Sequence, residues 1–131
     1  MDADKSLTCL AKKYVLSSNL HLVDECIQQM TLDAEYCSNT VGSFKGVQDV
    51  RNMMTTFFDK FPTVHWQVSE YVMFSDDCVQ FDFVRTGCSN AEGKPIVANG
   101  REFLHFTTNG SDPIPRICKI EVETTSVNVL D

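Results

Sequence analysis

The chain has 131 residues, which suits one domain over residues 1–131, and 43% of them are hydrophobic. Its formal net charge of −7 would repel a phosphate backbone, so no nucleic-acid partner is expected. Its beginning, MDADKSL, is polar and unlike a secretory signal, and no apolar run reaches the roughly 20 residues that span a bilayer, so we expect a cytoplasmic protein without a membrane partner.

Three helices are expected in the first half of the chain. Apolar residues recur at helical spacing from Asp4 to Ser18, from Leu20 to Met30 and from Val47 to Phe61. The third helix follows Gly46 and must end before Pro62, because a proline disfavours helical backbone in the residue before it. Between the second and third helices, the segment AEYCS is expected to be short and extended.

After Pro62 the apolar residues recur at every second position, as they do in strands. This alternation predicts four long strands, which cover Val64 to Ser69, Val79 to Val84, the second half of residues 93–106, and about Arg116 to Thr125 with Cys118, Ile120 and Val122 on one side. Turn-forming residues separate these strands at 76–77, 87–95 and 109–115. Helices followed by an antiparallel meander predict an α+β domain with the helices packed on one face of the sheet.

One predicted strand places a carboxylate among core residues. Because side chains alternate across a strand, Glu102, Leu104 and Phe106 should share one face. Desolvation disfavours the charged form of a carboxyl group and raises its pKa, and a neutral acid can donate a hydrogen bond to a ligand. The alternative is that Glu102 pairs with Arg85 or Arg101 and closes a buried polar network.

The order and spacing of six segments resemble the nuclear transport factor 2-like superfamily, close to its SnoaL-like and ketosteroid-isomerase-like members. These segments are KYV, FKGVQDVRNMM, FFDKFPTVHWQV, DDCVQFDFVRTG, GKPIVANGREFLHF and RICKIEV, and they cover about residues 5–125. The resemblance implies a cone in which a curved antiparallel sheet wraps around three N-terminal helices and encloses an apolar pocket. It also implies a homodimer.

The resemblance further implies three site positions. In ketosteroid-isomerase-like members a tyrosine and a later acid donate hydrogen bonds to a substrate oxyanion, and Tyr14 and Glu102 fall on these positions. The proton-shuttling carboxylate of those members falls on Ser38, whose neutral hydroxyl cannot take a proton from carbon near pH 7. Asp33 and Glu35 are nearby in sequence, but a shift of one residue would turn either side chain to the other face.

Two classes of function remain open from the sequence. The first is a SnoaL-like small-molecule pocket protein that binds an apolar ligand bearing a carbonyl or carboxylate, with isomerase-, cyclase- or dehydratase-like acid–base chemistry left open. The second is a non-catalytic protein-interaction or adaptor module of the transport-factor type. Convergence of polar groups in a pocket would distinguish the first from the second. The expected ligand-binding residues of such a pocket are Phe58, Trp66, Phe81, Phe83, Leu104 and Phe106.

No metal or cofactor is expected. The six cysteines contain no C-x-x-C pair and the three histidines lie far apart in sequence, so a structural zinc site is not indicated. In a cytoplasmic protein the six thiols should be reduced. Phe103 and His105 should point to the outer face of the sheet, opposite to Glu102, where they are candidate contacts of the homodimer.

Overall fold

The computed structural model describes residues 3–109 and 112–130, which form three helices and six strands. The helices are α1 (Ala3–Asn19), α2 (Val23–Gln28) and α3 (Val47–Lys60). The strands are β1 (Met30–Ser38), β2 (Gly42–Lys45), β3 (His65–Ser75), β4 (Cys78–Ser89), β5 (Pro95–Asn109) and β6 (Asp112–Val129). Within these described residues, no helix is both long and apolar enough to cross a membrane.

The six strands form one mixed sheet in the order β2-β1-β6-β5-β4-β3. Four neighbouring pairs are antiparallel, but β1 runs parallel to β6, with Tyr36 opposite Ile120. The prediction of a purely antiparallel sheet is therefore wrong at this pair. Parallel partners are joined by a long connection rather than a tight turn, so their pairing leaves no local pattern in the sequence.

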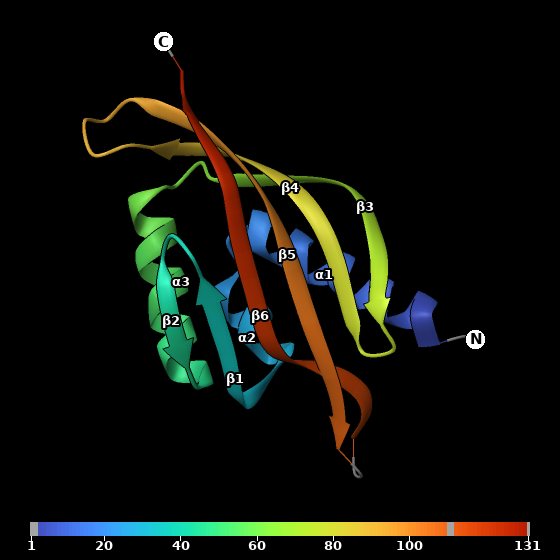
Figure 1. Ribbon diagram of the computed structural model, residues 1–131. Helices are drawn as coiled ribbons and strands as arrows, with labels where there is room; N and C mark the ends of the chain where they lie inside the picture. The colour runs from blue at the N-terminus through green and yellow to red at the C-terminus, as the bar shows by residue number, and fades with distance from the viewer. Residues whose placement is uncertain (1–2, 110–111, 131) are drawn as a thin grey trace.

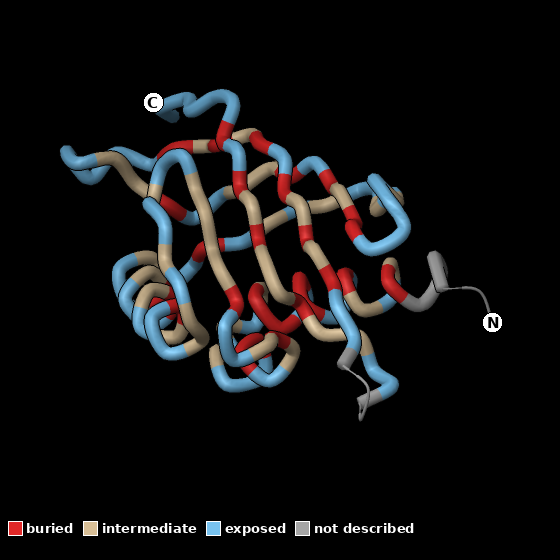
Figure 2. The backbone as a smooth tube through the Cα atoms, turned by 60° about the horizontal axis from the view of Figure 1, so that its bottom comes forward, coloured by how far each residue is buried: buried red, intermediate tan, exposed pale blue. Residues whose placement is uncertain are grey.

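All three helices lie on the same side of the sheet, and the long strands bend over them (Figure 1). Helix α1 packs on β3 and β4, and α3 packs on β1 and β2. On α1, buried residues recur at three- and four-residue spacing, which gives the helix one inner face: Leu7, Ala11, Tyr14 and Ser18. Buried and exposed positions alternate along the strands (Figure 2), so this helix face and the inner face of the sheet share one core.

Several details of the predicted elements differ from the structure. Strands β3 and β4 run past their predicted ends, to Ser75 and Ser89. Helix α2 is shorter than the predicted span from Leu20 to Met30, because His21 has a positive φ of 59° and Met30 already pairs with β6. Strand β6 extends beyond both predicted ends, and its Cys118 does not share the face of Ile120, because the pairing with β5 skips it. Strand β2 was not predicted, since its four residues are too few to show a period.

Two glycines allow close approaches that shape the sheet. Gly100 of β5 lies at a register shift against β6, and a Cβ there would lie 2.5 Å from the carbonyl oxygen of Glu123. Gly87 of β4 has a φ of +82°, and a Cβ there would collide with the carbonyl group of Thr63. The pairing of β4 with β5 is interrupted beside Gly87, just after Arg85. This bulge bends β4 where its inner side chains reach a cavity.

Candidate functional site

Two adjoining cavities lie on the helix side of the sheet. The inner cavity has a volume of about 40 Å³ and is lined by side chains from α1, α3, β1, β3, β4, β5 and β6. The outer cavity has a volume of about 730 Å³, which is in the range of small-molecule pockets. The two cavities share four lining residues, which are Val41, Met53, Phe57 and Arg85. One end of a molecule in the outer cavity is therefore next to the inner cavity.

Glu102 supplies the carboxyl group of the inner cavity. It lies on β5 between Phe81 of β4 and Val122 of β6, both of which are buried. Glu102 is only 6% exposed, and within the described part of the chain it forms no hydrogen bond or ion pair. Burial raises the pKa of Glu102 from 4.5 to about 8, so the carboxyl group is largely protonated at neutral pH.

The two arginines considered as partners of Glu102 do not pair with it. Arg101 points to the exposed face, where its Nε donates a hydrogen bond to Oδ1 of Asp82 at 2.8 Å. Arg85 lines the inner cavity but, in the range that the structure covers, forms no ion pair with a carboxylate. The alternative of a buried network between Glu102 and an arginine is therefore contradicted.

Two tyrosines from other elements line the inner cavity with Glu102: Tyr14 of α1 and Tyr36 of β1. Burial raises the pKa of both phenols above the ordinary value of 10, and the charge of Glu102 raises it further. A side-chain hydrogen bond with Ser18 acts in the opposite direction on the pKa of Tyr14 but does not outweigh burial. Both phenols therefore keep their protons at neutral pH and can donate hydrogen bonds.

Ser38 lines the inner cavity, but its hydroxyl group holds a turn. Its Oγ accepts hydrogen bonds from the backbone amides of Thr40 and Val41 at 3.2 Å and 3.1 Å. The neighbouring carboxylates do not take its place, because Asp33 is exposed and Glu35 forms an ion pair with a lysine of β2 at 3.7 Å. Glu102 is thus the one carboxyl group among the described residues that line the inner cavity.

The predicted ligand-binding residues fall into two groups. Two of them, Phe58 and Trp66, line the inner cavity. The other four are buried in the hydrophobic core and belong to the lining of neither cavity; they are Phe81, Phe83, Leu104 and Phe106. Alternation identified the inner face of the sheet, but it could not show which part of that face is covered by a helix and which part borders a cavity.

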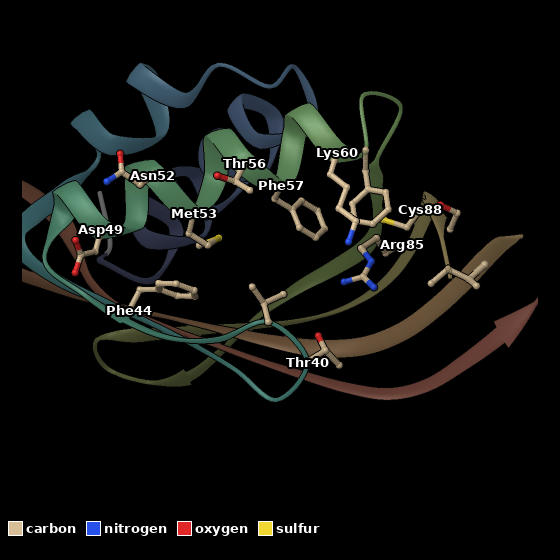
Figure 3. Close-up of a pocket in the computed structure, with 14 residues that line it drawn as sticks. Thr40, Phe44, Asp49, Asn52, Met53, Thr56, Phe57, Lys60, Arg85 and Cys88 are labelled. Atoms are coloured by element: carbon tan, nitrogen blue, oxygen red, sulfur yellow. The ribbon is translucent and has the colours of Figure 1, made fainter. Parts of the chain in front are cut away.

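The outer cavity lies between α3 and the inner face of the sheet, and its ends differ in charge (Figure 3). Lys60 and Arg85 point into one end, whereas Asp49 lies at the other. The guanidinium carbon of Arg85 lies 5.8 Å from the ring centroid of Phe57, which is a cation–π distance. The outer cavity is therefore an apolar space with one cationic end.

Several polar residues of the cavities were not predicted, and two of them left a signal in the sequence. Tyr36 lies two positions before Ser38 on the same strand, so the alternation of AEYCS could have placed both on one face. Arg85 follows Phe81 and Phe83 at two-residue spacing on β4, and this pattern could have placed it on the inner face. Both spacings can be seen in the sequence, but they indicate a cavity residue only when the strands that border the cavity are known.

The other titratable groups in the described part of the chain give no second site with a buried carboxyl group. His105 lies on the outer face with its Nε2 3.6 Å from a carboxylate oxygen of Glu121, and His65 is exposed. His21 stacks on Phe58 with ring centroids 4.3 Å apart. Over residues 3–109 and 112–130, no group of three or more His, Cys, Asp or Glu residues could hold a metal ion.

Comparison with known proteins identifies the fold. No protein-family model and no curated protein matches the chain. A ketosteroid isomerase-like protein from Erwinia carotovora matches with a TM-score of 0.70 and 16% identity, over 93% of this chain and 95% of that chain. A SnoaL-like protein from Burkholderia thailandensis matches with a TM-score of 0.69 and 16% identity, over 91% of this chain and 94% of that chain.

A third solved structure is the epoxide hydrolase/cyclase-like enzyme SalBIII, described with pyran ring formation in the polyether salinomycin. It matches with a TM-score of 0.77 and 12% identity, over 94% of this chain and 95% of that chain. At such identities the likeness establishes the fold. The predicted resemblance to SnoaL-like and ketosteroid-isomerase-like proteins of the nuclear transport factor 2-like superfamily is confirmed at that level.

Proposed function

We propose that this chain, which has the fold of SnoaL-like and ketosteroid-isomerase-like proteins, binds a small apolar molecule through an oxygen atom in the inner cavity. The observation that carries the proposal is the buried carboxyl group of Glu102, which has no partner in the described chain. With Tyr14 and Tyr36 it offers O–H donors to one carbonyl or carboxyl oxygen. An inner cavity of about 40 Å³ suits such a polar end, and an outer cavity of about 730 Å³ suits the apolar body.

Glu102 also supports acid–base chemistry in this cavity. With a pKa of about 8 it populates both protonation states near neutral pH, which suits a group that transfers a proton. As the acid, it gives its proton to a ligand oxygen, and the resulting carboxylate later takes a proton back. Tyr14 and Tyr36 donate hydrogen bonds to negative charge that develops on the ligand.

The absence of a carboxylate at Ser38 narrows the type of reaction. Migration of a double bond needs a base that takes a proton from carbon, and a neutral hydroxyl group cannot do this near pH 7. A cyclase-like step, in which a hydroxyl group of the ligand attacks carbon, needs a proton donor to the departing oxygen, which Glu102 provides. The attacking hydroxyl group releases a proton, which the resulting Glu102 carboxylate takes back. One protein of this fold, SalBIII, is described as an epoxide hydrolase/cyclase-like enzyme.

The convergence of polar groups favours a pocket protein over the protein-interaction module that the sequence left open. Donors from α1, β1 and β5 point into one buried space, where they are inaccessible to a protein surface. A ligand with a flat apolar body can reach these donors through the outer cavity, because the two cavities share lining residues.

The test is a binding measurement with 2-acetylnaphthalene, a flat ketone, by isothermal titration calorimetry. We expect Glu102→Gln to keep the affinity, because an amide can also donate a hydrogen bond. Glu102→Ala and Tyr14→Phe should each weaken binding by about 1–3 kcal/mol, because each leaves a buried polar group without a partner. Ketosteroid double-bond migration should be absent from all four proteins.

Glu123→Ala is the matched control, because Glu123 is exposed on the outer face of β6 and the truncation is the same. Its affinity for 2-acetylnaphthalene should equal that of the unchanged protein. If Glu102→Ala and Glu123→Ala bind equally well, or if the unchanged protein does not bind the ketone, the proposed site is wrong. Isomerase turnover would show that a base lies elsewhere, and Asp33 and Glu35 would then be substituted first.

A further inference from the structure

Two cationic side chains, Arg85 and Lys60, point into one end of the outer cavity. The Nε atom of Arg85 is buried and has no hydrogen-bond partner among the described residues. Neither Arg85 nor Lys60 forms an ion pair with a described carboxylate, although the chain carries 18 acidic and 11 basic residues. Since carboxylates are in excess, the lack of a partner at this position needs an explanation.

The packing of α3 holds both cations at the same place. Phe57 and Lys60 are three residues apart on α3, so they lie on one side of the helix. The guanidinium group of Arg85 lies over the ring of Phe57, and the ammonium group of Lys60 points into the same end of the cavity (Figure 3). Like charges at one end of a cavity repel each other, and an anion bound between them would remove that repulsion.

The chemistry of Arg85 fits a carboxylate. A guanidinium group presents its N–H donors in a planar fork that matches the two oxygens of a carboxylate. Leaving a buried donor such as Nε unpaired is unfavourable, so an acidic group on a ligand would satisfy it. The apolar side chains beside Arg85, which include Phe57 and Ile96, lower the local dielectric and would strengthen this pairing.

The backbone spacing of Arg85 and Glu102 limits the length of the ligand. Arg85 lies opposite Ala98 of β5, and Glu102 lies four residues further along the same strand. Four strand residues separate the two backbone positions by about 13 Å, and both side chains line the inner cavity. Arg85 lines both cavities, so a single molecule can reach from its guanidinium group to the carboxyl group of Glu102.

We propose that the ligand is an apolar, flat carboxylic acid with a second oxygen at its far end, and that Arg85, assisted by Lys60, binds the carboxylate. The part that concerns the far oxygen rests on the proposed function of Glu102. Arg85 is a specificity-determining residue that selects acids over their neutral analogues. Charge at one end and a neutral hydrogen-bond donor at the other fix the orientation of the ligand.

The experiment compares three probes by isothermal titration calorimetry: 6-acetyl-2-naphthoic acid, its methyl ester, and 2-acetylnaphthalene. The unchanged protein should bind the acid at least about tenfold more tightly than the ester, because only the acid pairs with the arginine fork. Arg85→Gln should remove that preference by weakening the binding of the acid more than the binding of the ester. Lys60→Gln should reduce the preference by a smaller factor.

Arg101→Gln is the matched control, since Arg101 lies on the outer face in an ion pair with Asp82, and it should leave all three affinities unchanged. Arg85→Lys is the second variant in case the glutamine variant does not fold. It keeps the charge but loses the fork, so it should retain only part of the preference for the acid.

Three results would overturn the proposal. The acid and the ester could bind the unchanged protein equally, Arg85→Gln could weaken both by the same factor, or Arg85→Lys could keep the full preference. If 2-acetylnaphthalene binds and depends on Glu102 but the acid gains nothing, only this inference fails. If no probe binds the unchanged protein, the proposed function fails with it.

Discussion

At the scale of single residues, the central feature is a carboxyl group that burial keeps neutral. Glu102 lies between two buried apolar neighbours, Phe81 and Val122, and has no ion-pair partner in the described chain. Because nothing compensates the charged form, burial alone raises the pKa of Glu102 to about 8. Folding therefore favours the protonated form, and stability must depend on pH.

The free energy of unfolding should fall as the pH rises from 4.5 to about 8. The folded protein binds the proton of Glu102 more tightly than the unfolded chain, whose carboxyl group has a pKa of 4.5. The contribution is fully present below pH 4.5 and is lost as the pH rises through about 8. Glu102→Gln does not titrate, so its stability relative to the unchanged protein should increase by about 3–4 kcal/mol between pH 5 and 8.

Urea unfolding followed by circular dichroism at several pH values measures this difference. The control is Glu123→Gln, the same substitution at an exposed position of the outer face, whose difference from the unchanged protein should stay constant. A constant difference for Glu102→Gln as well would mean that Glu102 is charged in the folded protein.

The buried environment of Glu102 could be predicted from the sequence, but only some of the residues that line the cavity could be predicted. Alternation with Leu104 placed the carboxyl group on the core face, and the structure buries both residues. Tyr36 and Arg85 were missed because a cavity forms where α3 leaves part of the sheet uncovered, and this depends on how distant elements pack. No local sequence pattern indicates how these distant elements pack.

At the scale of elements, the bulge of β4 brings its inner side chains to the outer cavity. Gly87 permits this bulge in two ways, since it has a positive φ and passes close to the backbone at Thr63. Any side chain there would meet the Thr63 carbonyl group and lie 2.8 Å from the Cα of Val64. The bulge separates Arg85 from Cys88, which both line the cavity.

Gly87→Ala should therefore destabilise the protein more than the same change at Gly93. Gly93 has a φ of +80°, close to that of Gly87, but a Cβ there would meet nothing within 4 Å. Gly93→Ala should cost about 1 kcal/mol of unfolding free energy from backbone strain alone. Gly87→Ala should cost at least about 2 kcal/mol more, because backbone atoms must move.

Urea unfolding of both variants measures the difference in their unfolding free energies. Because both glycines have a positive φ, this difference is the cost of the close contact between Gly87 and Thr63. Equal losses at the two positions would show that β4 can shift away from Thr63 without a penalty. A loss of probe binding in Gly87→Ala at full stability would instead show that the bulge mainly positions Arg85.

Elements with a strong local period could be predicted, and those defined by distant pairing could not. The period of α3 and its stop at Pro62 gave nearly the observed range, Val47–Lys60. The sheet was expected to be antiparallel, but β1 pairs with β6 in parallel, and β2 was not predicted. Both errors concern strands whose register is set by partners far away in the chain.

At the scale of the whole molecule, the outer face of the sheet carries an apolar patch. Phe74 of β3 is 62% exposed and packs edge-on against Phe103 of β5, with ring centroids 5.1 Å apart. Val72 of the same strand is 38% exposed. The helices cover the other face, so no described element covers this patch.

We expect the patch to be covered by a second copy of the chain in a two-fold homodimer. A self-complementary contact places Phe74 and Phe103 of one protomer near those of its partner, which removes both rings from water. Light scattering at micromolar concentration should give twice the chain mass of 14.8 kDa. Phe74→Glu should give the single-chain mass without unfolding the protein, because Phe74 is mostly outside the core.

Leu16→Glu is the control: Leu16 is 59% exposed on α1, on the other side of the molecule, and its substitution should leave the dimer intact. A mass of 14.8 kDa for the unchanged protein would contradict the homodimer, and a dimer that survives Phe74→Glu would place the interface elsewhere on the surface.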